Sequence, residues 1–167
     1  MKNITYQQGL DALRFKDSYS RLPTILDMHR SMRETVWLKL LGDSWTSCDN
    51  ISIHAEYLRA ILSGKFNARP MMTSSEWRHL NALPETVTIF RGCGSHNASG
   101  LSWTTERTIA EKFPFLNRYR VRDPQLIIAT VAKRDIVAFK NDRDESEVIA
   151  VRPEVESIES LVAKVAT

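Results

Sequence analysis

The sequence predicts an α+β fold in which helices come first and a β-sheet follows. Through residues 1–84, apolar side chains recur every three or four positions, which is the period of an amphipathic helix. Through residues 85–167 the apolar runs are short, rich in branched and aromatic residues and bounded by turn residues, as strands are. No linker or low-complexity segment separates the two stretches. We therefore expect residues 1–167 to form a single domain with a mainly helical part, 1–84, and a mainly β part, 85–167.

Helices are expected in the first part because its apolar positions fall on one face of each segment. They cover residues 22–41, 51–62 and 74–83, and a further helix around residues 5–16 is compatible with the same pattern. The first of these has Pro23 near its first turn and Gly42 just past its end. The third opens on Ser74 or Ser75 as its N-cap and stops before Pro84.

Strands are expected after Pro84, where the period shifts towards two. They cover residues 86–92, 100–104, 125–132, 135–140 and 147–151. One helix interrupts them at 104–113, capped by Thr104 or Thr105. The tail 155–166, "VESIESLVAKVA", suits either a helix or a closing strand.

Composition indicates an ordinary globular protein. Hydrophobic residues make up 43% and charged residues 26% of the 167 residues, and no apolar run is long enough to cross a membrane. Cys48 and Cys93 are far apart, the first residues lack the apolar stretch of a secretory signal, and we therefore expect a cytoplasmic location. A net charge of +3 is compatible with a phosphate-bearing partner without requiring one.

Arginine 91 ends a row of apolar residues on one strand face, in the stretch "VTIFRG". A guanidinium at such a place is costly unless it pairs with an anion or a carboxylate, so Arg91 is either a structural ion pair or part of a ligand site. Gly92, directly after it, lets the backbone turn or approach a ligand closely.

The stretch "GLSWTT" places Ser102 and Thr104 on one strand face and Trp103 on the other. A helix start follows at once, so its free backbone N–H groups can meet polar or anionic groups. Thr104 is equally suited to capping that helix.

Glu145 and Glu147, in "DESEV", stand one residue apart where an apolar run begins. If this stretch is extended, the two side chains point to the same face, roughly 7 Å apart. Two carboxylates on one face repel each other unless a positive or hydrogen-bonding group lies between them, and the alternative is a solvated loop end.

Taken in order, Arg91, Ser102-x-Thr104 and Glu145-x-Glu147 resemble the arginine–serine–glutamate class of mono-ADP-ribosyltransferases, which includes cholera-toxin-like and clostridial binary-toxin-like enzymes. The matching stretches are "TIFRG", "GLSWTTERTIAEKF" and "DESEVIAV", within residues 86–151. The resemblance implies helices followed by a split mixed β-sheet of the ADP-ribosyltransferase type. It also implies NAD as a substrate and no metal, and the four histidines indeed lack metal-ligand spacing.

The same resemblance implies the catalytic roles. Glu147 would hydrogen-bond a ribose hydroxyl of NAD and stabilise the sugar cation that forms as nicotinamide leaves, much as a carboxylate does in glycoside hydrolysis. Glu145 would orient or deprotonate the acceptor, and a pKa raised in one member of the pair would suit a base. Arg91 would pair with the pyrophosphate or ribose of NAD, Ser102 would hold Glu147, and Thr104 would brace the sheet.

The NAD-binding residues implied by the resemblance are Arg91, Gly92, Ser102, Trp103, Thr104 and Phe113. Trp103 faces away from Ser102, which favours the core, and Phe113 suits either the nicotinamide ring or the core. The segment "PFLNRYRVRDPQ" corresponds to the loop that covers the dinucleotide. If it is extended, its three arginines, Arg118, Arg120 and Arg122, line one face. Phe139 and Asn141 fall in the place of the acceptor-recognition loop.

We therefore expect a cytoplasmic, NAD-dependent mono-ADP-ribosyltransferase that modifies a macromolecular acceptor, either protein arginine or a nucleic-acid base, with release of nicotinamide. A toxin or phage-type effector fits this expectation, as does an inhibitor or antitoxin partner, and no membrane is involved. Two alternatives stay open. One is an NAD glycohydrolase, and the other is a non-catalytic nucleic-acid or protein-binding domain that uses the helical part as its surface.

Overall fold

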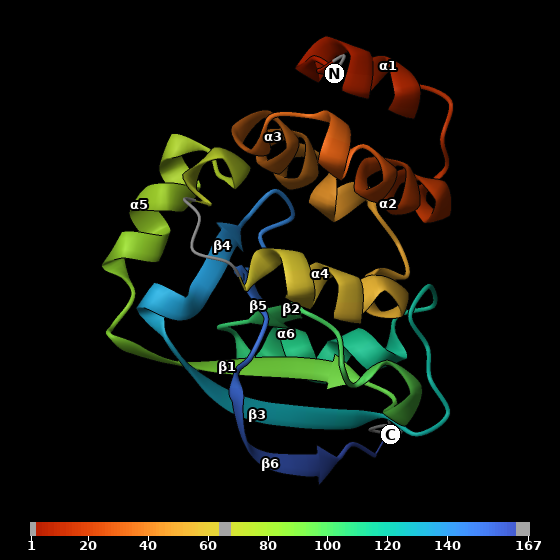
Figure 1. Cartoon of the computed structure of the whole chain (residues 1–167). Coiled ribbons are helices and arrows are strands. Elements are labelled where there is room, and N and C mark those ends of the chain that lie inside the picture. Colours follow the sequence, from red (N-terminus) through yellow and green to blue (C-terminus); the bar gives the residue numbers. More distant parts are fainter. Residues whose placement is uncertain (1–2, 64–67, 163–167) are drawn as a thin grey trace.

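The helical part is arranged as a layer over one side of a sheet (Figure 1). The computed structural model describes residues 3–63 and 68–162. Its helices are α1 (Tyr6–Leu13), α2 (Ser18–Asp27), α3 (Glu34–Ser44), α4 (Ala55–Leu62), α5 (Ser74–Ala82) and α6 (Arg107–Lys112). Short 3-10 turns join them, among them η1 (His29–Ser31), η2 (Trp45–Ser47) and η3 (Ile51–His54). The first five helices precede every strand, which confirms the expected order of helices and sheet.

The prediction of a single helix over residues 22–41 is wrong, because the chain forms two separate helices there, α2 and α3. Asp17 caps α2 by accepting hydrogen bonds from two backbone N–H groups, so Pro23 lies inside that helix rather than in its first turn. The chain leaves helical geometry at Met32, whose ψ is 154°. Both Met28 and Met32 are nevertheless buried. Apolar side chains on both sides of the break face one core, so the spacing in the sequence does not reveal it.

Capping decides where the other helices begin. Thr73, and not Ser74 or Ser75, caps α5: its hydroxyl accepts from the N–H of Glu76 at 3.2 Å, and the Glu76 carboxylate accepts from the N–H of Thr73 at 2.8 Å. The helix expected at 51–62 begins as the turn η3 and becomes α-helical only at Ala55. The N-terminal helix is present as α1.

Six strands form one sheet over the described residues. They are β1 (Thr86–Cys93), β2 (Ser102–Thr104), β3 (Gln125–Ala132), β4 (Ile136–Lys140), β5 (Glu147–Ala150) and β6 (Glu154–Ser160), in the spatial order β4-β5-β2-β1-β3-β6. All the recorded pairings are antiparallel, so the α+β class is confirmed and the expectation of a mixed sheet is wrong. The ambiguous tail forms the edge strand β6, which pairs with β3 up to Ser160.

The sheet bends sharply where β1 meets β2. β1 and β3 pair along their whole length, from Thr86↔Ala132 to Cys93↔Gln125, whereas β1 and β2 share the single register pair Phe90↔Thr104. In Figure 1, β1, β3 and β6 lie together, while β4 and β5 run steeply across them. At this narrow junction the end of β2 lies between Phe90 of β1 and the start of β5.

One cluster of buried apolar side chains spans both parts of the chain. It includes Trp37 and Trp45 from the helical part and Ile89 and Ile149 from the sheet. Among the described residues, no helix is long and apolar enough to cross a bilayer.

Candidate functional site

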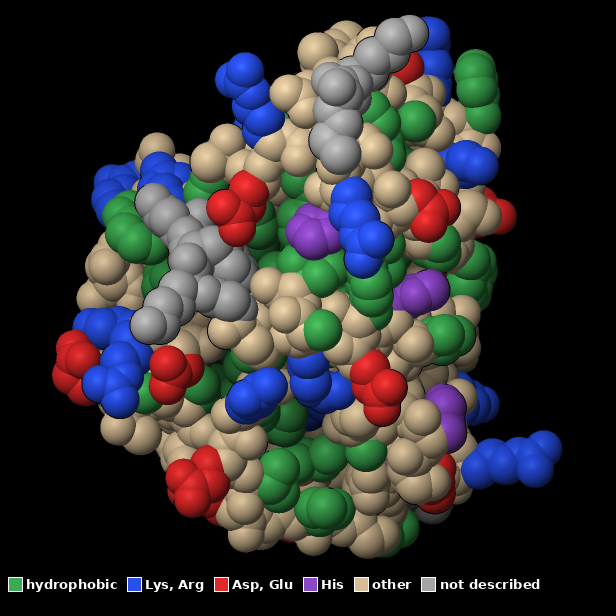
Figure 2. All heavy atoms as spheres, viewed as in Figure 1, with side chains coloured by type: hydrophobic (Ala, Val, Ile, Leu, Met, Phe, Trp, Pro, Cys, Tyr) green, Lys and Arg blue, Asp and Glu red, His purple; other side chains and the backbone are tan. Residues whose placement is uncertain are grey.

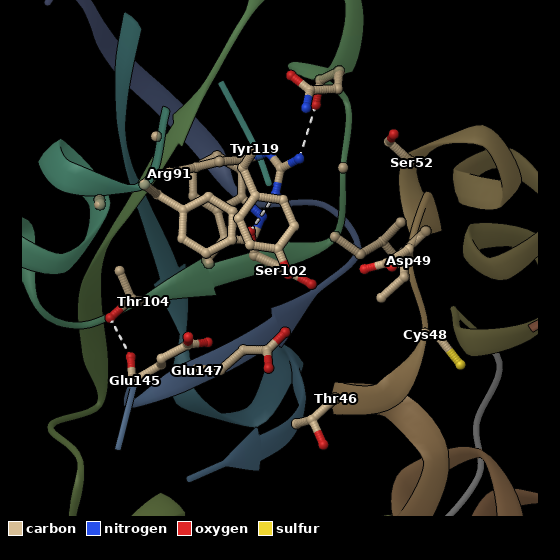
Figure 3. A pocket seen from close by; sticks show the side chains of 18 of the residues that line it. Thr46, Cys48, Asp49, Ser52, Arg91, Ser102, Thr104, Tyr119, Glu145 and Glu147 are labelled. Carbon is tan, nitrogen blue, oxygen red and sulfur yellow. Dashed lines mark hydrogen bonds between the residues drawn. The ribbon is translucent and has the colours of Figure 1, made fainter. Parts of the chain in front are cut away.

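A pocket opens where the helical part meets the bend of the sheet (Figure 3). Its walls come from the turns after α3, from β1 and β2, from α6 and from the loop that leads into β5. The structure brings every residue of the predicted site to this pocket: Arg91, Gly92, Ser102, Trp103, Thr104, Phe113, Glu145 and Glu147. Segments far apart in the sequence therefore meet at one cavity.

Glu147 is the first residue of β5 and lies opposite Thr104 of β2. The indole Nε1–H of Trp45 donates to its Oε1 at 2.8 Å, and Ser102 of β2 lines the same pocket. Burial raises the pKa of Glu147, the polar side chains of Ser102 and Trp45 oppose this rise, and the negative charge of Glu145 adds to it. Of the two glutamates, Glu147 is the one whose pKa is raised, and the expected hydrogen bond between Ser102 and Glu147 stays a prediction.

Glu145 lines the same pocket, but its backbone is not part of a regular strand. It lies in the loop before β5, where Asp144 and Ser146 both have left-handed backbones, with φ of 55° and 45°. The two glutamates are therefore not neighbours on one extended strand face, which corrects that expectation. In Figure 3 both carboxylates nevertheless point into the cavity.

Thr104 holds the loop that carries Glu145. Its hydroxyl donates to the backbone oxygen of Glu145 at 2.7 Å and accepts from the N–H of Glu106 at 3.0 Å, just before α6. One side chain therefore ties β2 to the β5 loop and to the start of the helix. This contact agrees with the bracing role expected of Thr104.

Arg91 lines the pocket and also holds β2 in place through hydrogen bonds. Its Nη1 donates to the backbone oxygen of Ser102 at 2.6 Å, and its Nη2 donates to that of Asn97 at 2.8 Å. Burial lowers the pKa of the guanidinium, and the nearby Glu147 carboxylate opposes that shift. The guanidinium is also packed against Gly100, where a Cβ atom would lie only 2.1 Å from Nη2. The expected contact between Arg91 and the pyrophosphate of NAD stays a prediction.

Gly92 and Trp103 have packing roles as well as a place in the pocket wall. A Cβ atom on Gly92 would lie 1.8 Å from the backbone oxygen of Ala110, so this glycine is required for α6 to lie against β1. Trp103 is 5% exposed and belongs to the core, as its strand face favoured. Among the described residues, its buried Nε1 has no hydrogen-bond partner.

An aromatic pair forms another wall of the pocket. The rings of Phe113 and Tyr119 stack at 4.4 Å with an interplanar angle of 17°. Arg118, beside them, forms an ion pair with Asp49 of the helical part, and Ser18 donates to the same carboxylate at 2.6 Å. Phe113 is half-buried at the cavity rather than in the core. The loop after α6 is thereby fastened to the helical part across the pocket.

The three arginines of this loop do not share one face, which corrects the extended arrangement that was expected. The loop turns, with the N–H of Tyr119 donating to the backbone oxygen of Leu116 at 2.8 Å. Arg118 faces the candidate pocket, whereas Arg120 and Arg122 line a separate hollow beside β6.

The two candidates for acceptor recognition lie behind the site. Phe139 is 4% exposed and stacks on His79 at 5.5 Å, so it is a core residue. The side-chain oxygen of Asn141 accepts from the N–H of Ser146 at 3.0 Å and shapes the loop that carries the glutamates. Neither contact supports direct recognition of an acceptor.

Sequence reasoning missed several residues of this site, among them Trp45, Asp49, Asn97 and Gly100. Trp45 and Asp49 come from the helical part, where no motif could be matched. Gly100 stands in the matched stretch "GLSWTT", but its closeness to Arg91 depends on the turn after β1.

The cysteines are poor candidates for nucleophiles. Burial raises the pKa of Cys48 to about 11 and also raises the pKa of Cys93, so both thiols are protonated at neutral pH. Within residues 3–63 and 68–162, no group of three His, Cys, Asp or Glu side chains is placed to hold a metal ion.

Comparison of the chain with protein-family models, with curated proteins and with solved structures finds no match. The chemistry of the pocket is therefore what bears on function.

Proposed function

We propose that the protein is an NAD-dependent mono-ADP-ribosyltransferase that passes ADP-ribose to a macromolecular acceptor and releases nicotinamide. The observation that carries the proposal is the half-buried carboxylate of Glu147, which lines the pocket and accepts a hydrogen bond from Trp45 at 2.8 Å. A second carboxylate, that of Glu145, points into the same pocket. Among the described residues, no hydrogen bond or ion pair engages the Glu145 carboxylate.

Glu147 suits the cleavage of NAD. The bond between ribose and nicotinamide breaks with its electron pair moving to the ring, so the ring leaves neutral and the sugar acquires oxocarbenium character. A fixed carboxylate that accepts a hydrogen bond from a ribose hydroxyl stabilises that charge. One preorganised group of this kind contributes about 3–4 kcal/mol, or roughly 10²–10³ in rate.

Glu145 suits the second half of the reaction. The acceptor forms a bond to the anomeric carbon as nicotinamide departs, and its proton passes to Glu145. Two carboxylates in unequal environments are a common way to divide such roles. Here both are half-buried, but Glu147 accepts a hydrogen bond from Trp45, whereas the head group of Glu145, in its loop, has no hydrogen-bond partner among the described residues.

The NAD molecule would be held by the predicted set: Arg91, Gly92, Ser102, Trp103, Thr104 and Phe113. The stacked rings of Phe113 and Tyr119 offer a flat surface for a nicotinamide or adenine ring, and the guanidinium of Arg118 offers charge for phosphate. Arg91 acts in this proposal by fixing β2, and with it Ser102, as well as by its charge.

Protein arginine and a nucleic-acid base are both candidate acceptors. On the face shown in Figure 2, Lys and Arg side chains are intermixed with Asp and Glu rather than gathered in one basic patch. That face offers no broad site for a phosphate backbone, which weighs against a nucleic-acid-binding module that uses it without catalysis.

The proposal is tested by incubating the purified protein with cell lysate and NAD labelled on its adenine part. We expect nicotinamide release and label in a macromolecule, and protease or nuclease digestion then identifies the acceptor class. Label found only in free ADP-ribose would instead show a glycohydrolase. If the wild-type protein releases no nicotinamide in the presence of lysate, the proposal is wrong.

Two variants test the division of labour. Glu147→Gln should abolish both nicotinamide release and transfer, because it removes the charge that stabilises the sugar cation. Glu145→Gln should spare part of the hydrolysis of NAD while reducing transfer. Equal loss of both activities in Glu145→Gln would contradict the separate roles.

A further inference from the structure

Trp45 connects the helical part of the chain to the candidate catalytic carboxylate. It opens the turn η2 directly after α3, and its side chain is fully buried. Its Nε1–H donates to Oε1 of Glu147 at 2.8 Å, although 102 positions separate the two residues. In the part of the chain that the structure describes, this is the hydrogen bond that joins the helical part to Glu147.

We propose that Trp45 is a positioning residue for the cleavage of NAD, and that its indole N–H sets the orientation of the Glu147 carboxylate. The inference rests on the function proposed above. An ionised carboxylate has about four acceptor positions. With one taken by Trp45, acceptor positions are left for Ser102 and for a ribose hydroxyl in the pocket.

The chemistry of the indole suits this task better than that of a cation. A Lys or Arg at the same place would also hold the carboxylate, but its charge would cancel much of the negative potential that stabilises a sugar cation. The indole N–H is a neutral group that only donates. A ring that is fully buried also has little freedom to move, so the hydrogen bond costs little further ordering.

The turn that carries Trp45 is itself fastened next to the site. The hydroxyl of Thr46 donates to Asp142, in the loop before β5, at 3.2 Å. The hydroxyl of Ser47 donates to the backbone oxygen of Ser44 at 2.7 Å, which closes the turn on α3. The donor therefore reaches Glu147 from a rigid element that contacts the same loop.

The alternative explanation is that Trp45 only fills the core, since it is one of the largest buried side chains. Trp45→Phe separates the two explanations, because it keeps an aromatic ring and removes the N–H. The chain offers a matched control in Trp37→Phe. Trp37 is also fully buried, but its Nε1–H donates to the backbone oxygen of Ile25 at 2.8 Å, away from the residues that line the pocket.

The first readout is steady-state kinetics of nicotinamide release. For Trp45→Phe we expect kcat to fall about 10-fold or more, with KM for NAD within about 2-fold, because a hydrogen bond to a charged catalytic group is lost. The acid limb of the kcat profile should move to higher pH, since the lost donor had favoured the ionised form of Glu147. Trp37→Phe should leave kcat and the acid limb unchanged, because the N–H that it removes is not bonded to Glu147.

The second readout does not need activity. Titration of the Glu147 carboxyl, followed by ¹³C NMR without NAD, should show a higher midpoint in Trp45→Phe than in wild type and in Trp37→Phe. Identical titrations in all three proteins would overturn the inference, as would equal kcat values in an active enzyme. If wild type titrates as expected but cleaves no NAD, the proposed function fails and the positioning of Glu147 stands only as a structural fact.

Should Trp45→Phe fail to fold, benzothienylalanine at position 45 preserves the bicyclic shape and replaces the N–H with sulfur. The same loss of kcat and the same shift of the acid limb are expected for that protein. Wild-type kinetics in a folded protein with this residue would overturn the inference.

Discussion

A methyl group at position 100 should disrupt the support beneath β2. In Gly100→Ala, the new Cβ would lie 2.1 Å from Nη2 and 2.5 Å from Cζ of Arg91, whereas real Cβ contacts essentially never fall below 3.0 Å. Gly100 has no positive φ, so the backbone itself accepts alanine and the cost is steric. The guanidinium must move by about 1 Å, which the close packing of a protein interior resists.

That displacement strains both hydrogen bonds that Arg91 donates, to Ser102 at 2.6 Å and to Asn97 at 2.8 Å. A hydrogen bond from a charged group contributes about 1.5–3 kcal/mol to stability. Relaxation of the neighbouring atoms should recover part of what the two strained bonds lose together. We therefore expect the free energy of unfolding to fall by about 3 kcal/mol. For a chain of this length, that corresponds to a decrease in Tm of about 6–12 °C. β2 joins β1 through the single pair Phe90↔Thr104, so β2 should shift when it loses the support of Arg91. Because Ser102 of β2 belongs to the proposed site, nicotinamide release should fall as well.

Urea unfolding followed by circular dichroism measures the change, and Gly9→Ala is its matched control. At Gly9 the new Cβ would lie 2.7 Å from Cδ2 of Leu40, the end of a flexible side chain, and alanine gains about 1 kcal/mol of helix propensity in α1. Gly9→Ala should therefore stay within about 1 kcal/mol of wild type. If Gly100→Ala is equally stable, Arg91 is not held as the structure shows, and the reasoning about β2 is wrong.

Three further substitutions test other contacts. Burial raises the pKa of Glu147, so the folded protein loses stability as pH rises and this carboxyl must ionise in the folded state. Glu147→Gln removes that cost and should raise Tm at pH 7, by an amount that shrinks towards about pH 4. The same variant should abolish activity. Asp49→Asn removes the ion pair with Arg118, and amide hydrogen exchange in residues 116–121 should rise about 5-fold, as for the loss of about 1 kcal/mol. Lys140→Met leaves the buried Glu76 carboxylate without its cation at 3.0 Å, and the free energy of unfolding should fall by about 3–5 kcal/mol in urea.

Each of these has an outcome that would contradict its explanation. A Tm difference for Glu147→Gln that is equal at pH 4 and pH 7 would show that the carboxylate charge is not what destabilises the fold. Unchanged exchange in Asp49→Asn would mean that other contacts hold the loop. The double variant Lys140→Met with Glu76→Gln should recover part of the lost stability, and no recovery would argue against an unpaired buried charge.

Local pattern was enough to find most elements. The strand expected at residues 125–132 is β3 to the residue, because alternation and turn residues act over a few positions. The break between α2 and α3 was missed, since Met28 and Met32 face the same core on either side of it. The cap of α5 was misplaced for a different reason: Thr73 and Ser74 are both good caps, and the Thr73-x-x-Glu76 spacing of a capping box, which distinguishes them, is local and was overlooked.

For the site, the order of motifs in the sequence was sufficient to select Arg91, Ser102, Glu145 and Glu147, which the structure brings to one pocket. The sequence alone could not supply Trp45 or Asp49, because they approach from the helical part across the core and carry no local signal. The backbone at Glu145 was likewise decided by tertiary contacts, since hydrogen bonds from Thr104 and to Asn141 hold its left-handed loop. Residue types and periodicity act locally and can be read from the chain, whereas the partner of a buried carboxylate depends on which distant surfaces pack together.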